Sequence, residues 1–439
     1  MRALLCVALL GGCVFDGDIG SHDSTPTPPA SAHIFDSPRW AMTIGNTDND
    51  FGWQVGLDPD GNVFASGAFR GDVDFGGTVL ESLPGGYWIS KRAASDGHEL
   101  WTRAFGGTMA VCPDGGAIVA NIIQGDMDVG GQVVHAPASG TTLVAKYNGD
   151  GTLAWTYDLG VAGLSQVSAI AVASNGRIAV AGWYQGSLQL PEGAVTATKS
   201  DGFLLVLDRD GDPLWSKSTK NLGDGQQPAL YQVVATPGGD FVVAGGLGSS
   251  IVFAGVTLDN TAFESSFLAR FATDGQLLWA GVLAPDEGGV LTTRGENIVM
   301  GSAWKSDASD SFGAPNLEGL NPSGHMLWST HAIDTLGSTN ALTASANGTI
   351  YSGGGLDPDL HQGDVPGCMF LAAHDASGAL LDVTGFGPVK NCSVGPTSLA
   401  TRSGTLAMVG TTDVSIDLGT GPLRFAGRRD IVIAAFDVP

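Results

Sequence analysis

The feature that most constrains the fold is a tight glycine turn followed within a few residues by tryptophan, which recurs along the chain. The recurrences are SDGHELW (95–101), NGDGTLAW (148–155), DRDGDPLW (208–215), TDGQLLW (273–279) and PSGHMLW (322–328). Their tryptophans are spaced by 54, 60, 64 and 49 residues. A period of this size is typical of repeat architectures in which one small supersecondary unit is copied along the chain.

The units between these turns are built from short apolar strands. Seven second strands end in small residues: 61–69, 116–123, 176–184, 239–247, 296–304, 348–356 and 404–412. A longer connection and a third strand follow, at 87–92, 142–147, 203–208, 267–272, 369–375 and 430–437, with a weak counterpart at 315–320. Gly is 66 of 439 residues and charged residues are only 15%, which favours an all-β chain with many turns over a disordered one.

The two chain ends complete one unit between them. The last unit stops after its third strand, 430–437, and the missing fourth strand is found at 37–45, which brings Trp40 into register with the other tryptophans. The sixth turn has Asp382 in the tryptophan position. A sheet split between the termini closes a β-propeller and leaves no edge open. We therefore predict an all-β, seven-bladed β-propeller of four-stranded blades over residues 37–439, with the last blade closed by the N-terminal strand and the tryptophans packed between blades.

The N-terminus has the pattern of an export signal. Arg2 precedes an apolar run, and Leu10-Gly11-Gly12-Cys13 resembles a bacterial lipobox. The expectation is a lipoprotein signal peptide at 1–12, lipidation of Cys13, and a flexible Pro- and Ser-rich linker over 13–36. The alternatives are an ordinary secretory signal or a mis-assigned start. With lipidation, the protein is exported and anchored in the cell envelope, and residue 14, which is Val, favours the outer membrane.

The net charge disfavours some classes of partner, and the cysteines suggest one disulfide. The formal net charge of −24 disfavours nucleic acid, whose phosphates require Lys and Arg patches. The membrane is expected as a partner through the lipid anchor only, and a monomer is expected. Cys368 and Cys392 flank one predicted hairpin and could form a disulfide in an oxidising compartment, and Cys112 is left over as a small buried side chain.

The strand, turn and tryptophan pattern over about residues 37–439 resembles secreted bacterial β-propeller repeats, related at motif level to quinoprotein-type and Asp-box propellers. The resemblance implies the fold and leaves the activity open. Quinoprotein dehydrogenases would bring a vicinal Cys-Cys pair, which this sequence lacks. DRDGDPLW stands where an Asp-box would, but Gly211 follows Asp210 directly and no Thr precedes Trp215.

No residue is predicted to be catalytic, and no cofactor is predicted. Asp208, Asp210 and Asp212 are weak candidates for calcium, because alternating carboxylates suit this ion, but the turn lacks a further carboxylate. The alternative is a β-turn in which Asp and Gly set the backbone conformation. GDVDFGG (71–77) and GDMDVGG (125–131) follow two second strands, and their repetition favours a shared turn over a shared metal site.

Long, varied connections between second and third strands and between blades are expected on one face, where repeat scaffolds usually carry function. The candidates for ligand contact on this face are Trp183, Tyr184, Trp304, Asp307 and Asp310. The first hypothesis is a binding or scaffold module for a protein or polysaccharide. The alternatives are an envelope hydrolase or lyase with a carboxylate- or calcium-dependent site at the central channel, and a purely structural envelope protein.

Overall fold

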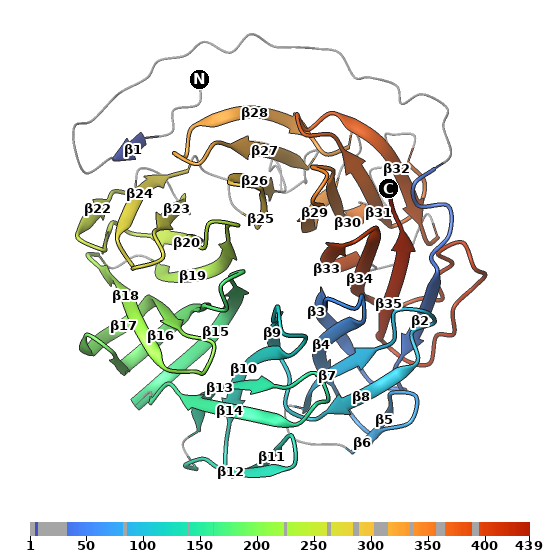
Figure 1. Cartoon of the computed structure of the whole chain (residues 1–439), viewed down its shortest axis with the longest axis horizontal. Helices are drawn as coiled ribbons and strands as arrows, with labels where there is room; N and C mark the ends of the chain where they lie inside the picture. The colour runs from blue at the N-terminus through green and yellow to red at the C-terminus, as the bar shows by residue number, and fades with distance from the viewer. Residues whose placement is uncertain are drawn as a thin grey trace.

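Seven four-stranded sheets surround a common axis in the computed structural model, as the blades of a propeller (Figure 1). The structure describes residues 5–7, 33–81, 86–138, 140–160, 162–223, 226–260, 265–283, 289–302, 315–333, 337–356, 365–388 and 395–439. We number the blades 1 to 7 along the chain, starting from the sheet β3-β4-β7-β8. The predicted all-β, seven-bladed architecture is confirmed.

Each blade runs from an inner to an outer strand. The inner strands are β3 (Phe51–Leu57), β9 (Thr108–Val111), β15 (Ala162–Val172), β19 (Gln226–Ala235), β25 (Val290–Arg294), β29 (Gly337–Ala344) and β33 (Gly395–Arg402). The second strands are β4 (Val63–Phe69), β10 (Ala117–Ile123), β16 (Ile178–Leu190), β20 (Phe241–Gly248), β26 (Asn297–Ser302), β30 (Ile350–Leu356) and β34 (Thr405–Thr412). The third strands are β7 (Gly86–Arg92), β13 (Thr141–Tyr147), β17 (Gly193–Leu207), β23 (Ser265–Phe271), β27 (Asn316–Leu320), β31 (Met369–His374) and β35 (Asp430–Asp437). The outer strands are β8 (Glu99–Arg103), β14 (Leu153–Asp158), β18 (Pro213–Asn221), β24 (Leu277–Val282), β28 (Met326–His331), β32 (Leu380–Phe386) and β2 (Trp40–Ile44).

Among the described residues, seven further short strands lie outside this pattern. They are β1 (Leu5–Val7), which pairs with β24, and the hairpin strands β5 (Val73–Asp74), β6 (Val79–Leu80), β11 (Asp126–Val129), β12 (Gln132–His135), β21 (Ile251–Phe253) and β22 (Val256–Leu258). The three hairpins connect second to third strands in blades 1, 2 and 4.

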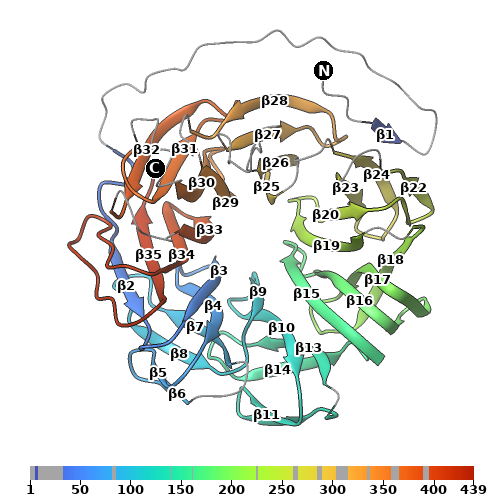
Figure 2. The ribbon, with the colours of Figure 1, turned by 180° about the vertical axis from the view of Figure 1, so that it is seen from behind.

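The ring is closed by the N-terminal strand, as predicted. β2 pairs antiparallel with β35, so that Trp40 lies opposite Ala435 and Ile44 opposite Ile431. Both views show the blue β2 beside the red β35 (Figures 1 and 2). The amide of Arg39 extends the pairing with a 2.7 Å hydrogen bond to the carbonyl of Ala435. The last sheet is therefore as complete as the other six.

The outer-strand tryptophan of one blade packs under the glycine turn of the next. Trp215 of blade 3 donates its indole N–H to the carbonyl of Thr273 in blade 4 at 3.0 Å. Gly275 in the same turn has φ +87°, and a Cβ there would lie 2.7 Å from the Trp215 ring. The same close approach joins Trp40 to Gly97, Trp101 to Gly151, Trp155 to Gly211, Trp279 to Gly324 and Trp328 to Gly378. The repeated turn needs glycine both for its left-handed backbone and for the indole against it.

Asp382 replaces tryptophan where the following blade has no such turn. The third strand of blade 7 runs to residue 437 and its outer strand comes from the N-terminus, so nothing there covers an indole. Asp382 Oδ1 instead lies 3.1 Å from His33 Nδ1, and the same carboxylate accepts the amide N–H of Ile34. Phe35 is 0% exposed and packs against Tyr351 and Phe436. The predicted linker over 13–36 is therefore too long, because residues 34 and 35 belong to the core.

The connections between second and third strands, which the sequence predicts on one face, pack into the interfaces between blades in the described part of the chain. In blade 4 the β21–β22 hairpin folds outward, and β21 pairs with the outer strand β18 of blade 3. Phe253 on this hairpin is 0% exposed and lies 5.3 Å from the ring of Phe271. The connections of blades 1, 2, 3 and 7 likewise bury Phe75, Val129, Leu190 and Leu418. These residues join the hydrophobic clusters shared with the preceding blade, so the connections wedge neighbouring blades together.

Candidate ligand-binding site at the inner strands

A β-bulge recurs in the inner strands at the same level of five blades. The register skips one residue in β3, β15, β19, β29 and β33. The residues without a ladder partner are Trp53, Ser168, Tyr231, Asn340 and Thr397, which we call the bulge residues. Four of them, all but Tyr231, are more exposed than both chain neighbours. The inner strands surround the axis (Figures 1 and 2). The bulge residues on them are therefore distributed around this axis in blades 1, 3, 4, 6 and 7, and we call this set the bulge ring.

A glycine on the second strand makes room for each bulge. The residue that precedes each bulge residue pairs with Gly67, Gly182, Gly245, Gly354 or Gly410. A Cβ on Gly182 would lie 2.0 Å from the carbonyl oxygen of Gln166, and one on Gly354 would lie 1.6 Å from that of Ser338. The small residues that end the predicted second strands are therefore the sequence signal of the bulges. The sequence alone identifies these glycines only as small residues that end the second strands, and it does not predict the bulges.

Trp53 is the most exposed of the large bulge side chains. It is 38% exposed, and its ring centroid lies 5.6 Å from that of Tyr87 at an interplanar angle of 54°. Trp53 lies near the start of β3 and Tyr87 near the start of β7, so both belong to the end of blade 1 that receives the inter-blade and second-to-third connections. We call this end of the ring the long-connection face and this pair the aromatic platform.

The polar groups around the bulges are uncharged and link neighbouring inner strands. The Thr397 hydroxyl donates to the carbonyl of Gly52 at 2.8 Å, and the amide of Val55 donates to the Ser398 hydroxyl at 3.2 Å. Thr108 Oγ1 donates to the carbonyl of Val167 at 3.0 Å. These hydroxyls hold blade 7 to blade 1 and blade 2 to blade 3. They fix the spacing of the inner strands on which the bulges stand.

Two buried carboxyl groups lie where blades 7 and 1 meet on the long-connection face. Asp50 is 0% exposed and accepts the amide N–H groups of Arg70 and Asn46 at 3.0 and 2.9 Å. Asp430 is 1% exposed and accepts the amide of Ala426 at 2.7 Å, while its Oδ1 has no hydrogen-bond partner. Burial raises the pKa of both carboxyls, and their mutual repulsion adds to the rise for Asp50. Neither is placed to touch a ligand, because both are covered.

The sequence-predicted ligand residues separate in the structure. Tyr184 is 1% exposed and packs edge-on against Phe203 in the core, so its place among ligand residues is a wrong prediction. It fails because side chains alternate along β16, and Tyr184 falls on the side that packs against blade 2. Trp183, on the opposite side of that strand, is half-buried. Trp304, Asp307 and Asp310 lie outside the described residues.

The DRDG turn uses its first carboxylate for the backbone. Asp208 Oδ1 accepts the amide N–H groups of Asp210 and Asp212, both at 2.9 Å. This is the turn conformation that the sequence offered as the alternative to calcium. Within the described part of the chain, no three His, Cys, Asp or Glu side chains are grouped so as to hold a metal ion. In the repeated GDxDxGG segments, Asp74 and Asp128 likewise accept glycine amides of their own hairpin turns.

One Ser–His contact and two of the cysteines are buried. Ser352 Oγ and His374 Nε2 are 2.9 Å apart, but both residues are 0% exposed and burial lowers the pKa of His374 to about 4. Cys112 is a buried free thiol whose pKa burial raises to about 12. Cys368 is disulfide-bonded, and Cys392 lies outside the described residues, so their pairing stays a prediction. Cys13 and its lipidation also lie outside them.

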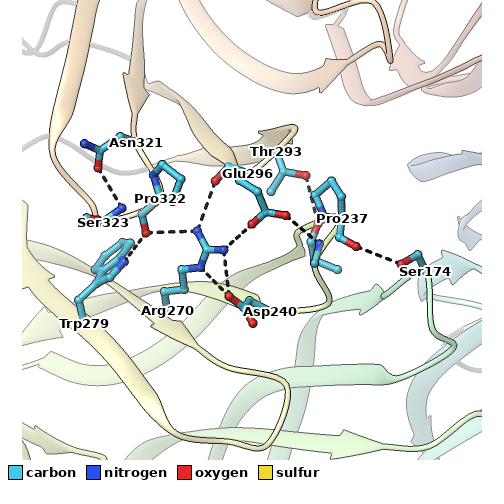
Figure 3. A network of polar contacts seen from close by, with 12 residues as sticks. Ser174, Pro237, Asp240, Arg270, Trp279, Thr293, Glu296, Asn321, Pro322 and Ser323 are labelled. Atoms are coloured by element: carbon cyan, nitrogen blue, oxygen red, sulfur yellow. Dashed lines mark hydrogen bonds and ion pairs between the residues drawn. The ribbon is translucent and has the colours of Figure 1, made fainter.

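On the opposite face, which carries the tight turns, charged groups bind blades to one another. The Arg270 guanidinium of blade 4 contacts Asp240 at 2.9 Å and reaches Glu296 of blade 5 at 2.5 Å (Figure 3). It also donates to the carbonyl of Pro322, the group that accepts the Trp279 indole N–H. Arg270 is 4% exposed, so this network holds the blade 4–5 interface and offers little to a ligand.

A cavity of about 200 Å³ lies between blades 2 and 3 on the tight-turn face. Its lining includes Cys112, Lys146 and Arg209. Lys146 is already engaged, because its ammonium contacts Asp114 at 2.5 Å. A second depression, of about 440 Å³, lies at the rim beside Glu99, Arg103 and Asp150. There Glu99 accepts the amide of Thr78 and Arg103 donates to the carbonyl of Gly151, so its polar groups hold the rim hairpin and the next turn.

Among the described residues, no helix is long and apolar enough to cross a bilayer. No family model matches the chain. A curated relative, the regulatory protein FlaEY of Caulobacter vibrioides, is 26% identical over 343 residues, covering 73% of this chain and 34% of FlaEY. The chain thus spans about a third of that relative.

Three solved structures with a similar chain path illustrate the structural matches. BamB from Moraxella catarrhalis is 12% identical, with 93% of this chain and 99% of BamB covered and a TM-score of 0.38. The polysaccharide lyase Uly1 is 12% identical, with 90% of each chain covered and a TM-score of 0.47. The acylaminoacyl peptidase of Pyrococcus horikoshii is 9% identical, with 86% and 53% covered and a TM-score of 0.49. Likenesses at these identities leave the activity of this chain open.

Proposed function

We propose that this protein is an exported cell-envelope lipoprotein, anchored in the outer membrane through Cys13, whose β-propeller is a binding or scaffold module for a protein or polysaccharide. The observation that carries the binding role is the aromatic platform. Trp53 is an indole held in the open by a bulge and is 38% exposed. Of the outer-strand tryptophans, Trp155 and Trp328 are half-buried and the other four are 6–7% exposed. Exposed aromatic side chains on a rigid strand are typical anchors of a binding surface.

The scaffold supports this role because the platform stands on fixed elements. Trp53 is flanked by Gly52 and Gln54, both held in the β3–β4 ladder. The hydroxyl of Thr397 from blade 7 fixes the carbonyl of Gly52. A side chain placed in this way is ordered before a ligand arrives, which lowers the entropic cost of binding. The support for the proposed lipid anchor is the lipobox-like sequence at residues 10–13.

Binding is tested by capture from an envelope extract on the immobilised full chain. The wild type and Leu214→Ala, which shortens a 42% exposed side chain on the rim, are expected to retain the same protein or polysaccharide. Trp53→Ala is expected to retain at least tenfold less, the effect of losing about 1.4 kcal/mol of binding free energy. Equal retention by Trp53→Ala, or no specific retention by the wild type, contradicts the proposal.

The anchor is tested separately by cell fractionation. The wild type is expected in the outer-membrane fraction and to be radiolabelled when cells are fed a labelled fatty acid. Cys13→Ser is expected to lose the label and to leave that fraction. A wild type that carries no label, or a Cys13→Ser variant that fractionates as the wild type does, rules out the lipid anchor without affecting the binding test.

A further inference from the structure

The aromatic platform and the bulge ring have a chemistry that selects among ligands. We infer that they bind an uncharged polysaccharide, with a sugar ring stacked on Trp53 and Tyr87 and hydroxyl groups directed to the neighbouring bulge residues. This inference rests on the proposed binding function and names the class of its ligand.

The first argument is the shape of the platform. A pyranose ring has flat faces of C–H groups with small positive partial charges, and the face of an aromatic ring is negative. The indole of Trp53 is exposed, and the phenol of Tyr87 lies against it at an angle of 54°. Two rings inclined in this way form a shallow corner that fits a sugar ring against one face and its exocyclic groups against the other. An extended polymer can then run across the long-connection face.

The second argument is that the bulge residues themselves carry no charge. None of the bulge residues is charged, and none of their immediate chain neighbours is charged either. The set offers a hydroxyl at Ser168 and an amide at Asn340, while Thr397 Oγ1, whose hydrogen is donated to the carbonyl of Gly52, can still accept a hydrogen bond. Neutral donors and acceptors of this kind pair with sugar hydroxyls, whereas a cationic peptide would need carboxylates beside the aromatic rings.

The third argument is the charge of the whole chain. With a formal net charge of −24, the molecule repels polyanions at long range. An acidic polysaccharide would therefore need local cations to bind at the ring, and the bulge residues supply none. A neutral polymer is not repelled by the acidic chain and needs no cations at the ring. It is therefore the class of glycan that fits the ring.

The fourth argument is the way in which the bulges arise. A glycine stands opposite the start of each bulge, and a side chain on Gly182 or Gly354 would meet a carbonyl oxygen at 2.0 or 1.6 Å. Each bulge leaves one residue out of the ladder, and in four of the five blades that residue is more exposed than its chain neighbours. Besides Trp53, these more exposed bulge residues are the neutral polar side chains of Ser168, Asn340 and Thr397, which lie at one level of their blades. Spacing by blades matches a ligand with repeated units better than a single compact molecule.

The test is affinity electrophoresis of the full chain through gels that contain one soluble polymer each. The neutral probes are dextran, a soluble β-1,3-glucan, galactomannan and arabinoxylan, and the charged probes are alginate and polylysine. At least one neutral probe is expected to retard the wild type. Trp53→Ala is expected to weaken its association constant at least tenfold, Trp53→Phe to restore part of it, and Leu214→Ala to leave it unchanged. Thermal unfolding of each variant confirms that it is folded.

Two results overturn the inference. One is retardation by alginate or polylysine that exceeds retardation by every neutral probe, and the other is the absence of retardation by all the neutral probes. If neutral probes fail while an envelope protein is captured in a Trp53-dependent way, the ligand class is wrong and the proposed binding function stands. If the protein binds neither a glycan nor an envelope protein, both the proposed binding function and the inferred ligand class are wrong.

Discussion

At the scale of single residues, the contact between glycine and tryptophan is the unit that holds blades together. At Gly275 two requirements coincide, since its φ of +87° excludes most side chains and the Trp215 ring leaves no room for a Cβ. The two effects can be separated, because Gly255 in the β21–β22 turn has φ +83° but no atom within 4 Å of its would-be Cβ. Comparing substitutions at Gly275 and Gly255 therefore separates the steric effect of the indole from the effect of the backbone conformation.

Gly275→Ala is expected to lower the free energy of unfolding more than Gly255→Ala does. Both variants incur the cost of a left-handed alanine, about 1–2 kcal/mol. Only Gly275→Ala adds overlap with the Trp215 ring, a further cost of about 1–3 kcal/mol. Urea unfolding followed by tryptophan fluorescence measures both. Equal losses in the two variants would show that the turn needs glycine for its backbone alone.

Asp430 is the residue for which a pH dependence can be assigned. Burial raises the pKa of its carboxyl, so the folded protein binds this proton more tightly than the unfolded chain does. Stability from this group is therefore complete below the pKa of an unfolded aspartate, about 4, and is lost as pH rises through the folded value. Its Oδ1 has no partner to offset the cost of ionisation.

Asp430→Asn is therefore expected to be more stable than the wild type at pH 7, on the order of 1 kcal/mol. The gain is expected to shrink as pH falls toward 4, because the wild-type carboxyl then becomes neutral as well. Asp50 remains in both proteins, but its pKa is raised partly by repulsion from Asp430, so removing that charge also eases ionisation of Asp50 and adds to the expected gain at pH 7. Urea unfolding from pH 4 to pH 8 measures this difference. A gain that is independent of pH would mean that ionisation of Asp430 is not its cause.

At the scale of elements, the connections between second and third strands act as wedges between blades. The β21–β22 hairpin illustrates this, because β21 extends the sheet of the preceding blade and Phe253 enters the blade 3–4 core beside Phe267 and Phe271. The β11–β12 hairpin of blade 2 has the same location but leaves Val133 59% exposed. The two positions provide a matched test of burial.

Phe253→Ala is expected to lower the free energy of unfolding by about 3–5 kcal/mol, because it removes a fully buried ring. Val133→Ala is expected to change it by less than about 0.5 kcal/mol. Thermal and urea unfolding compare the two. If Phe253→Ala is as mild as Val133→Ala, the hairpin is an ordinary surface loop and the wedge interpretation fails.

Strand order was predictable from this sequence, whereas the role of the connections was not. The tryptophans and glycine turns recur every 49 to 64 residues, and the alignment of Trp40 with them indicates the blade shared by the two chain ends. Both signals are local to each repeat, so they can be found in the sequence alone. The burial of Phe75 or Phe253 depends on the preceding blade, which a local pattern does not show. The alternating V-D-F-G-G and M-D-V-G-G segments were visible, and their apolar positions were the signal of the wedge.

The candidate site was harder to predict than the fold. Trp183 and Tyr184 are predicted to contact a ligand because they are aromatic and end the predicted second strand 176–184. Neighbouring residues of a strand point to opposite sides, however, and Tyr184 is buried. Trp53 is not among the predicted ligand residues, and it lies in the inner strand β3, where one of two sides is normally buried. Only the bulge turns it outward, and the bulge is recorded in the sequence by a glycine on the next strand, Gly67.

At the scale of the whole molecule, the closed ring depends on the pairing of β2 with β35. This pairing brings residues near 41 against residues near 434 and completes the sheet that contacts both blade 1 and blade 6. It also explains why Asp382, and not a tryptophan, ends the series, because the chain ends occupy the space of the missing turn. The contacts between the other blades do not involve β2 and could also form in an open arc of blades. The pairing of β2 with β35 is therefore the contact that distinguishes a closed ring from an open one.

The most direct test is a cysteine pair at Ala41 and Ala434, which lie opposite each other in the closing ladder. Opposed Cβ atoms in such a ladder are about 4.5–5.5 Å apart, close to disulfide reach. In Ala41→Cys/Ala434→Cys, mild oxidation is expected to give an intramolecular bridge that mass spectrometry finds between the two peptides. The control Ala41→Cys/Ala407→Cys, with the partner one strand farther in, is expected to give none. A bridge that forms only between molecules, or no bridge in the first variant, would contradict a ring closed by its own N-terminal strand.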